Sequence, residues 1–418
     1  MKSQTNNTFD LIVVGAGASG MIASIKSALE NKKVLLLEKL CSIGLKLKAT
    51  GGGRCNLSNT LDNVEFMNSF GRNGRFMATA IGEFNHKDLI TFLKTIGVDT
   101  HIPDGFRIFP TTHNSETILN ALEKELKRLN VQIEVSTKVE DIIVEDEKVV
   151  AVLTQNNKYF SSNVIIATGG LGYPKLGSQG EGHNIAKNLG HKITPLHPAM
   201  MPLSVKESWV ENCRADTIAK AIIKVDIKKY NKLKLSGDLI FTSNGIRGPV
   251  VLDFSREITP LLEKYDEVPI LINLTKGMDE NQILNHIKKQ ILNNPNKTLL
   301  EHLNTLIPNS VILEFLKLLD IDKNISFAKI EGIKKDKLIK LLAWTPLTIT
   351  GHDGFKKAMI TRGGIDLKQI DPNSMQSKLI DGLYFCGEIV NLDGPCGGYN
   401  LQWSFSSGWL AGKKSSDL

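Results

Sequence analysis

The sequence has few cysteines and no long apolar run. Its five cysteines are Cys41, Cys55, Cys213, Cys386 and Cys396, and no two of them have the C-x-x-C spacing of a zinc site or a redox dithiol. We therefore expect neither a disulfide framework nor a metal site. No segment approaches the ~18 apolar residues of a membrane span, and the polar start MKSQTNNTFD lacks the apolar core of a secretory signal. These absences predict a cytoplasmic protein without a membrane partner.

The composition indicates a folded chain with more than one domain. Its 418 residues correspond to two or three domains at about 150 residues each. Hydrophobic residues make up 41% and charged residues 23%, so the chain has the apolar content that disordered proteins lack. The net charge of +7 is mildly basic, which permits an anionic ligand or a nucleic acid without requiring either.

The strongest local signal is a glycine-rich turn between an apolar run and a helical pattern. The run Phe9–Val14 precedes Gly15–Gly20 (GAGASG), and Glu38 closes a second apolar run about 20 residues later. In this βαβ context Gly15 permits a tight turn, Gly17 lets the backbone approach a pyrophosphate, and Gly20 lets the helix pack near the sheet. Glu38 can accept hydrogen bonds from ribose hydroxyls and would repel a 2′-phosphate. The motif therefore disfavours NADP and leaves FAD and NAD open.

Three later features favour FAD. VIIATGG (Val164–Gly170) is typical of a strand that passes near the dinucleotide, and GLYFCGE (Gly382–Glu388) is typical of a late strand whose acidic end meets the ribityl chain. Gly397–Gln402 then opens a final helix rich in small residues. A helix N-terminus at this point can stabilise the negative charge that gathers near N1 of a reduced flavin.

Changes in composition divide the chain into three parts. Residues 1–194 and 346–418 predict one discontinuous, two-segment Rossmann-like α/β domain of the glutathione-reductase type, although the part after 346 begins with β strands of the next domain that end near 362. Residues 195–275, including the β-rich stretches 221–234 and 237–256, predict an inserted antiparallel, barrel-like substrate domain. Residues 276–345 have helical spacing and predict a small helical insert.

The longer motifs resemble one family of proteins. The stretches DLIVVGAGASGMIAS, KLKATGGGRCNLSN, VIIATGG, GSQGEGHNIAKNLGH, LIFTSNGIRGPVVLDFS, MITRGGIDL and SKLIDGLYFCGEIVNLDGPCGGYNLQWSFSSGWLAG run nearly from end to end of the chain. They are similar to the aminoacetone-oxidase-like bacterial flavoproteins. This is a three-domain group of NAD(P)/FAD-dependent oxidoreductases to which a bile-acid-intermediate reductase also belongs.

The resemblance implies an FAD site built from several segments. The Gly15–Gly20 turn and Glu38 would hold the dinucleotide, the Gly51–Asn56 loop would fold over it, and Val139 would meet adenine through its backbone. Arg54 also suits a pyrophosphate by its own chemistry, since a guanidinium binds one bidentately. The implied cofactor-binding residues are Gly15, Ala16, Gly17, Ala18, Ser19, Gly20, Glu38, Lys39, Gly53, Arg54, Cys55, Asn56, Val139, Ala167, Thr168, Gly169, Gly387, Glu388, Gly398, Asn400 and Leu401.

No catalytic residue is assigned from the sequence. The motifs place Cys55, Asn56, Tyr399 and Asn400 near the flavin ring by similarity. The candidates for substrate contact are Tyr173, Lys175, His352 and Arg362. Of these residues, Tyr173, Arg362 and Tyr399 are the candidates for a catalytic role.

The predicted function is that of an FAD-dependent oxidoreductase that acts on a small organic molecule by hydride transfer at flavin N5. No second strand–GxGxxG–helix unit lies between Gly170 and Phe385, so a dedicated nicotinamide domain is not expected. NADH or NADPH would then bind only transiently. Otherwise the organic substrate is the reductant and O2 or another acceptor is the oxidant.

Two lysine-rich stretches, 220–234 and 329–340, leave an alternative open. They permit an RNA-binding surface, as in flavoproteins that modify tRNA. Because Tyr230 is nearly the only aromatic residue among these lysines, the stretches are interpreted as solvated faces, and a nucleic-acid partner is not favoured. An FAD-dependent tRNA-modifying enzyme and a non-catalytic flavin-binding protein remain the alternatives, and the oligomeric state is left open.

Overall fold

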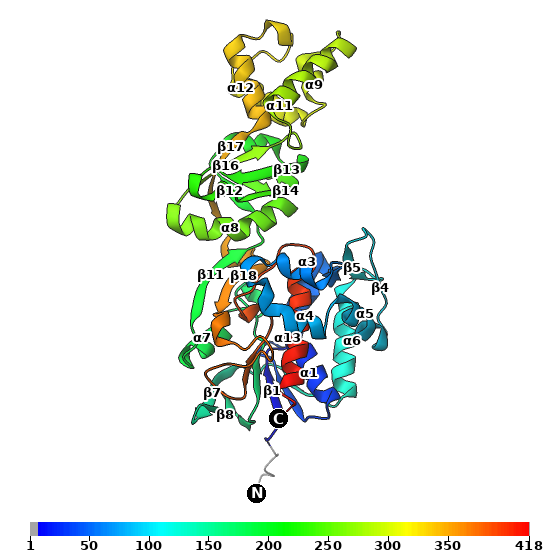
Figure 1. Cartoon of the computed structure of the whole chain (residues 1–418), viewed down its shortest axis with the longest axis vertical. Helices are drawn as coiled ribbons and strands as arrows, with labels where there is room; N and C mark the ends of the chain where they lie inside the picture. Colours follow the sequence, from blue (N-terminus) through cyan, green and yellow to red (C-terminus); the bar gives the residue numbers. More distant parts are fainter. Residues whose placement is uncertain (1–6, 418) are drawn as a thin grey trace. The chain divides into compact units, whose positions relative to one another are not determined.

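The computed structural model describes residues 7–417. These residues form two compact units, one made of the residues up to 197 together with those from 359 onward (unit 1) and the other of residues 198–358 (unit 2). Unit 1 is therefore discontinuous in the sequence. Many of the helices and strands of both units are labelled in Figure 1.

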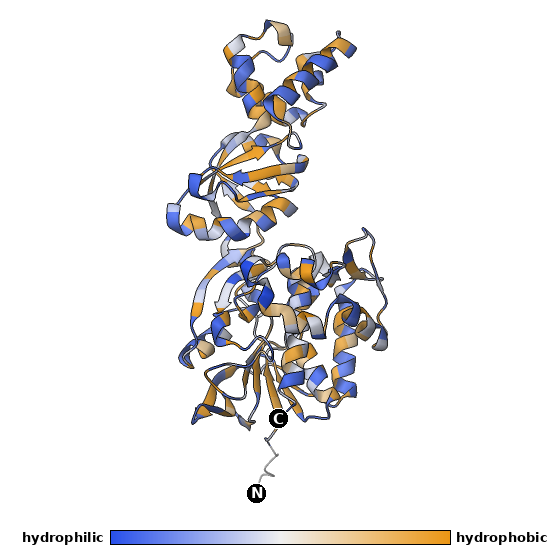
Figure 2. Ribbon diagram, in the orientation of Figure 1, coloured by the Kyte–Doolittle hydropathy of each residue, from blue (hydrophilic) through white to orange (hydrophobic). Residues whose placement is uncertain are grey.

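Unit 1 is built on a five-stranded parallel sheet with the strand order β19-β10-β1-β2-β6. The strands are β1 (Leu11–Val14), β2 (Val34–Leu37), β6 (Gln132–Glu134), β10 (Val164–Ile166) and β19 (Leu383–Phe385). The three central strands are buried throughout and appear as apolar strands in Figure 2. Such strands are typical of parallel sheets covered on both faces. The predicted Rossmann-type α/β fold is confirmed.

Two helices from opposite ends of the chain pack against each other beside the sheet. Helix α1 (Ala18–Leu29) follows β1, and helix α13 (Tyr399–Lys414) packs against it near the C-terminus. A Cβ atom added to Gly408 would lie 2.4 Å from the Ser19 carbonyl oxygen, and one added to Gly412 would lie 2.3 Å from that of Ala23. The small residues of α13 therefore let the two helix backbones approach closely.

Further elements surround this sheet. The helices are α2 (Leu45–Ala49), α3 (Asn63–Asn68), α4 (Ala78–Glu83), α5 (His86–Thr95), α6 (Ser115–Arg128) and α7 (Glu181–Asn188), with 3-10 turns at Thr50–Gly53, Gly71–Met77, Pro174–Leu176, Leu367–Gln369 and Gly387–Ile389. Small sheets pair β3 (Ser58–Asn59) and β4 (Thr100–His101) with β5 (Arg107–Pro110), and β7 (Val139–Glu145) and β9 (Lys158–Phe160) with β8 (Lys148–Thr154). Strands β11 (Ile193–Ala199) and β18 (Ile360–Ile365) pair where the chain leaves and re-enters unit 1.

Unit 2 contains a closed six-stranded barrel with the strand order β12-β15-β14-β13-β16-β17. The strands are β12 (Leu203–Val205), β13 (Thr217–Val225), β14 (Lys234–Phe241), β15 (Gly245–Arg247), β16 (Val268–Asn273) and β17 (Thr345–His352), with 3-10 turns at Ser208–Cys213, Lys228–Tyr230 and Gly354–Lys356. All neighbouring strands of the barrel pair antiparallel. The predicted antiparallel barrel is confirmed.

One stretch that was expected to be β-rich is a helix. The residues after Arg247 form α8 (Pro249–Tyr265), so the β-rich interpretation of residues 237–256 is wrong for its second half. Pro249 occupies the first turn, where its missing N–H leaves no hydrogen bond unmade. Val250, Phe254 and Ile258 recur every four residues and are buried, which is the helical rather than the strand period.

Four helices complete unit 2 between β16 and β17. They are α9 (Glu280–Asn293), α10 (Leu299–Leu303), α11 (Asn309–Leu318) and α12 (Gly332–Ala343), with a 3-10 turn at Phe327–Lys329. Trp209 lies between Phe241 of the barrel and Phe315 of α11, with ring centroids 5.7 and 5.6 Å apart. Barrel and helices therefore share one hydrophobic core. Among residues 7–417, no helix combines the length and the apolar character needed to cross a membrane.

Candidate cofactor-binding site

The glycine turn after β1 forms the floor of a pocket in unit 1. Gly15 has a φ of +101°, and a Cβ atom there would lie 2.8 Å from the Ala167 carbonyl oxygen at the end of the neighbouring strand β10. A Cβ on Gly20 would lie 1.9 Å from the Gly15 carbonyl oxygen, so this glycine lets α1 pack onto the turn. At Gly17, by contrast, a Cβ would meet no atom within 4 Å. The three glycines thus have different physical roles, and only Gly17 faces open space.

The N-terminus of α1 opens into the same space. Gly17 caps the helix without a side-chain hydrogen bond, and no acidic residue occupies the first turn. The first N–H groups of a helix have no partner within the helix, and they carry the positive end of its dipole. This end of α1 therefore suits a phosphate group.

Glu38 is fixed beside this turn by two backbone groups. One carboxylate oxygen accepts a hydrogen bond from the Ala16 N–H (2.9 Å), and the other accepts one from the Leu40 N–H (2.9 Å). An ionised carboxylate has about four lone-pair positions. Glu38 therefore keeps capacity to accept hydrogen bonds from a ribose while its orientation is set by the turn.

A second charged residue lies next to Glu38 in the pocket wall. The Lys39 ammonium group lies 2.6 Å from a carboxylate oxygen of Glu181, the first residue of α7. Burial is the largest single influence and opposes ionisation of Glu181. The hydrogen bond and charge of Lys39, a backbone hydrogen bond and the charge of Lys138 together outweigh it, so the pKa of Glu181 is lowered from its usual value. The pair joins the second strand of the sheet to the helix that follows β10.

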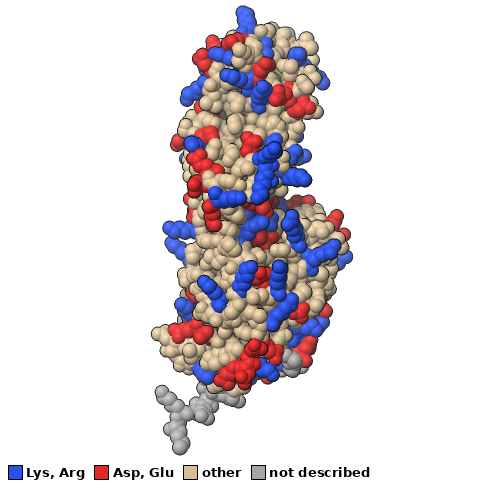
Figure 3. Space-filling model, turned by 60° about the vertical axis from the view of Figure 1, so that its left-hand side comes forward, with Lys and Arg blue, Asp and Glu red and all other residues tan. Residues whose placement is uncertain are grey.

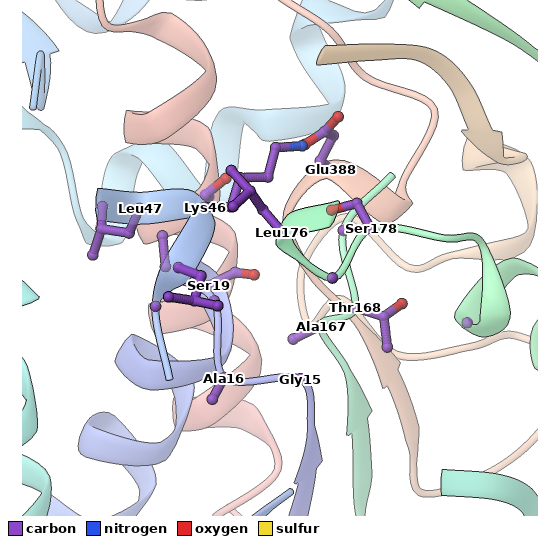
Figure 4. Close-up of a pocket in the computed structure, with 18 of the residues that line it drawn as sticks. Gly15, Ala16, Ser19, Lys46, Leu47, Ala167, Thr168, Leu176, Ser178 and Glu388 are labelled. Atoms are coloured by element: carbon purple, nitrogen blue, oxygen red, sulfur yellow. The ribbon is translucent and has the colours of Figure 1, made fainter. Parts of the chain in front are cut away.

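Another ion pair lies across the pocket from the glycine turn. The ammonium group of Lys46, on α2, lies 2.7 Å from one carboxylate oxygen of Glu388, which follows β19 (Figure 4). The other carboxylate oxygen of Glu388 accepts a hydrogen bond from the Thr361 N–H (2.7 Å). Helix α2 is itself joined to the glycine turn, because the Gly44 N–H donates to the Ala16 carbonyl oxygen (2.9 Å).

The pocket that these residues enclose fits a dinucleotide. The space inside the pocket, its open mouth included, is about 1340 Å³, and the lining reaches from the Gly15–Ser19 turn to Glu388. Thr168 lines the pocket, and its buried hydroxyl has no hydrogen-bond partner among the described residues. A buried polar atom of this kind calls for a partner. An elongated ligand that carries phosphates and hydroxyls would meet the open helix end, the Glu38 carboxylate and this hydroxyl.

Most of the predicted cofactor residues line this pocket. They are Gly15, Ala16, Gly17, Ala18, Ser19, Glu38, Lys39, Val139, Ala167, Thr168, Gly169, Glu388, Asn400 and Leu401. Seven predicted residues do not line it, namely Gly20, Gly53, Arg54, Cys55, Asn56, Gly387 and Gly398.

Gly20, Gly387 and Gly398 lie behind the pocket wall rather than in it. A Cβ on Gly387 would lie 2.5 Å from the Ser19 hydroxyl oxygen, and one on Gly398 would lie 2.4 Å from the Ser58 carbonyl oxygen. Trp403 on α13 donates its indole N–H to the Gly387 carbonyl oxygen (3.2 Å). These glycines permit close approaches between segments that form the site.

The Gly51–Asn56 loop approaches the start of α13. In the orientation that satisfies its neighbours, the Asn56 amide oxygen accepts from the Gly398 N–H (3.1 Å) and its nitrogen donates to the Ser58 carbonyl oxygen (3.0 Å). Arg54 is exposed, and its guanidinium group lies 5.9 Å from the centre of the Phe109 ring. Cys55 is fully buried, and burial raises the pKa of its thiol to about 11.

The three candidate catalytic residues do not line the pocket. Tyr399 is buried, and its ring lies 5.1 Å from that of Phe66 and 6.1 Å from that of Phe70. Arg362 forms an ion pair with Asp393 at 3.7 Å, and it is Asp393 that reaches the pocket. Tyr173, with a φ of +55°, precedes the turn whose later residues line the wall. Of the other candidates, Lys175 lies outside the lining and His352 belongs to unit 2.

The pocket also contains residues that the sequence reasoning missed. Lys46, Glu181 and Thr361 contribute its polar contacts from α2, α7 and β18. Lys46 and Thr361 lie within KLKATGGGRCNLSN and MITRGGIDL, two stretches that carry the family resemblance. The signal was therefore present in the sequence, but nothing local linked either residue to the glycine turn.

Comparison with known proteins finds matches that cover nearly the whole chain. A family model described as "HI0933-like protein Rossmann domain" matches residues 9–414. The chain is 29% identical over 410 residues to 3-dehydro-bile acid delta(4,6)-reductase from Clostridium scindens, covering 97% of this chain and 98% of that protein. It is 28% identical over 401 residues to ribosomal RNA dihydrouridine synthase from Escherichia coli K12, covering 96% of each chain.

A solved structure shares the fold. The 3-ketosteroid-delta4-(5alpha)-dehydrogenase from Rhodococcus jostii RHA1 superposes with a TM-score of 0.52 at 15% sequence identity, covering 100% of this chain and 98% of that chain. At this level of identity the likeness establishes the architecture alone.

Proposed function

Since the chain belongs to the HI0933-like protein family, we propose that it is an FAD-dependent reductase of a carbon–carbon double bond conjugated to a carbonyl group. The family predicted from the sequence is confirmed, and FAD is its cofactor. The chain is thus an FAD-dependent oxidoreductase, and the proposal concerns the bond that it reduces.

The observation that carries the proposal is what two full-length relatives have in common. One is named as a bile acid delta(4,6)-reductase and the other as a dihydrouridine synthase. Both names describe saturation of a carbon–carbon double bond, in a steroid ring for one and in a uracil ring for the other. In a 3-oxo-Δ4 steroid and in uracil alike, the double bond is conjugated to a carbonyl group, so hydride addition at the β-carbon is the shared reaction.

The described residues indicate how this chain would hold the cofactor. The Gly15–Gly20 turn and the N-terminus of α1 would bind the pyrophosphate, and Glu38 would bind the ribose of the adenosine half. The backbone at Val139, with Thr137 and Lys138, would face adenine. When bound, FAD supplies the hydride for the reaction.

The opposite end of the pocket would position the reacting half. Lys46, Glu388 and Thr361 form a hydrogen-bonded series there, and Asn400 holds the loop before α13 through its bonds to the Gly394 backbone. These groups would orient the flavin and exclude water. Catalysis by a flavoprotein requires chiefly such orientation and electrostatic tuning from the protein.

The hydride must reach the flavin from an external donor. Unit 2 carries a barrel and helices in place of a second parallel sheet with a glycine turn. We therefore propose that NADH or NADPH binds transiently to the same unit that holds FAD.

The test is a pair of half-reactions under anaerobic conditions. Bleaching of the flavin absorbance by NADH or NADPH, followed by reoxidation with a 3-oxo-Δ4,6 bile acid or a simple cyclic enone, is the expected result. The product should gain two hydrogens per reduced double bond by mass spectrometry. A flavin that nicotinamides leave oxidised, and that an amine such as aminoacetone reduces, would instead establish the oxidase that the family resemblance also implies.

A second candidate is reduction of a uracil ring within RNA. It is favoured by the similarity to the E. coli ribosomal RNA enzyme, which is nearly as extensive as that to the bile-acid enzyme. Here the mass gain should appear in ribosomal or transfer RNA incubated with the reduced protein. Nucleoside analysis of RNA from a deletion strain, with and without the restored gene, separates this function from small-molecule reduction.

A further inference from the structure

The hairpin formed by β13 and β14 in unit 2 is strongly basic. Residues 217–241 contain six lysines and two aspartates. Lys228, Lys229, Lys232 and Lys234 are exposed. None of these four forms an ion pair with a carboxylate among the described residues. The hairpin therefore presents uncompensated positive charge to the solvent.

Two of the lysines on this hairpin face each other directly. Lys224 on β13 and Lys234 on β14 are register partners, and Lys224 also pairs with Leu271 on β16. Ile223 precedes Lys224 and is fully buried, so the alternation along the strand places Lys224 on the outer face of the barrel. Like charges directly opposite each other destabilise a sheet. An anion bound at this face would relieve the repulsion between the two lysines.

Aromatic rings from distant parts of unit 2 lie among these lysines. The Lys224 ammonium group lies 4.1 Å from the centre of the Trp344 ring, just before β17. The Tyr230 ring, at the tip of the hairpin, lies 6.2 Å from that of Tyr265, at the end of α8. Each tyrosine has a lysine over its ring, Lys229 over Tyr230 at 5.7 Å and Lys264 over Tyr265 at 4.9 Å.

The rings are partly exposed and therefore accessible from solvent. Tyr230, Tyr265 and Trp344 all have intermediate exposure. A hydrogen bond from Lys264 lowers the pKa of the Tyr265 hydroxyl, with contributions from Tyr230 and from the charge of Lys229. The tyrosines thus share the positive field of the lysines. Figure 3 shows basic side chains gathered over the barrel in the face that it presents.

We propose that this lysine–aromatic surface, made of Lys224, Lys228, Lys229, Lys232, Lys234, Lys264, Tyr230, Tyr265 and Trp344, binds single-stranded RNA. Lysines that track a phosphate backbone, combined with aromatic rings on which bases stack, are the two components of single-strand recognition. An acidic protein partner would need only the lysines of this surface. The bases of an RNA duplex are stacked inside the helix, so they could not stack on its aromatic rings. The inference rests on the second candidate function, reduction of a uracil ring within RNA, for the choice of RNA as partner, and it deepens that function by naming the surface that would bind the strand.

The experiment measures binding of a short fluorescein-labelled oligouridylate to the FAD-loaded, full-length protein by fluorescence anisotropy. The dissociation constant is measured from about 50 mM to about 300 mM KCl, since counterion release makes phosphate binding fall steeply with salt. The double variant Lys228→Glu/Lys232→Glu should weaken binding. It should also reduce the salt slope by about 1.4, because each phosphate of a single strand that a lysine neutralises adds about 0.7 to that slope.

The matched control is Lys288→Glu/Lys289→Glu, which makes the same change in net charge at two exposed lysines of α9. It should leave the dissociation constant within about two-fold of that of the unaltered protein, because charges beyond a Debye length are largely screened. Equal weakening by both double variants would overturn the proposal, since the attraction would then depend on total charge alone.

The aromatic component is tested separately. Tyr230→Ala should weaken binding about five-fold or more, while Tyr230→Phe keeps the ring and should bind nearly as well. If Tyr230→Ala binds like the unaltered protein, or if duplex RNA binds as tightly as oligouridylate, the surface is not a single-strand site. Because binding is read without turnover, these outcomes are independent of whether the flavin reduces a carbon–carbon double bond.

Discussion

The ammonium group of Lys46 lies 2.7 Å from a carboxylate oxygen of Glu388, although 342 residues separate them in the sequence. Glu388 also accepts the Thr361 N–H with its other oxygen. The pair therefore joins three segments, the helix α2 that follows β2, the strand β18 and the end of β19, at one end of the pocket. Both side chains are more than three-quarters buried, with exposed fractions of 23% and 19%.

We expect the Lys46–Glu388 ion pair to contribute to the affinity of the protein for FAD. Lys46→Met and Glu388→Gln should each weaken FAD binding, and the double variant should lose less than the sum of the two. The coupling free energy should be about 1 kcal/mol, at the upper end of what partly exposed pairs contribute. Dissociation constants from flavin fluorescence in the four proteins measure it. Glu388→Ala should lose more than Glu388→Gln, because it also leaves the Thr361 N–H without its acceptor.

Replacement of Gly17 should remove FAD without unfolding the protein. Space is open around this residue, and its φ of −80° suits any L-residue, so Gly17→Leu should fold normally and fill the place of the pyrophosphate. The purified variant should be colourless, with the circular dichroism of the unaltered protein. Gly82→Leu on α4 is the control, since a Cβ there also meets nothing within 4 Å and the residue lies outside the pocket. A yellow Gly17→Leu protein would remove the pyrophosphate assignment.

Gly20→Ala should destabilise the protein, whereas Gly17→Leu should not. Its Cβ would lie 1.9 Å from the Gly15 carbonyl oxygen, so α1 must move away from the turn. Overpacking of this kind typically costs about 1–3 kcal/mol. Denaturant titration should show a lower free energy of unfolding for Gly20→Ala than for Gly17→Leu. Equal stabilities would show that the turn relaxes without strain.

Two buried histidines should make unit 1 sensitive to acid. Burial lowers the pKa of His183 and of His191 from the ordinary 6.5. At pH values between those lowered pKa values and 6.5, the unfolded chain binds more protons than the folded chain. The contribution of the two neutral histidines to stability is therefore complete above about pH 6.5 and is lost as the pH falls. The midpoint of thermal unfolding should fall accordingly between neutral and mildly acidic pH.

His183→Gln tests the assignment of this pH dependence. The glutamine amide can still donate to the Ile389 carbonyl oxygen, which His183 Nε2 contacts at 3.2 Å, but it does not titrate. The variant should therefore depend less on pH over the same range. An unchanged slope would show that another group controls the acid response.

The five thiols should divide into two classes by reactivity. Burial raises the pKa of Cys55 to about 11 and that of Cys213 and Cys386 to about 12, whereas Cys41 and Cys396 are exposed. Because the thiolate is the reactive form, iodoacetamide near neutral pH should modify Cys41 and Cys396 first. Peptide mass spectrometry over time, with a denatured sample as the reference, measures the order. Rapid modification of Cys55 would show that the Gly51–Asn56 loop opens readily.

Local patterns were sufficient to predict the glycine turn between β1 and α1 and the general architecture. The sequence Gly15–Gly20, its flanking apolar runs and Glu38 lie within one βαβ unit, so their geometry follows from short-range rules. The same holds for the barrel strands, with their alternating burial. The helix α8 was missed because a buried helix with β-branched residues looks like a strand over short windows, and its four-residue period emerges only over its full length.

Pairings between distant residues were decided by the tertiary structure alone. No spacing rule relates Lys46 to Glu388, since the segments after β2 and β19 meet at one edge of the sheet only after the chain has folded. The lysines of β13 and β14 likewise looked like an ordinary solvated face, because Tyr265 and Trp344 lie 35 and 114 residues beyond Tyr230 in the printed sequence. The sequence determined the glycine turn and the fold class through local periodicity and glycine geometry. Which charges pair and which rings join a basic surface depended on packing, since side chains far apart in the chain interact only where the fold places them.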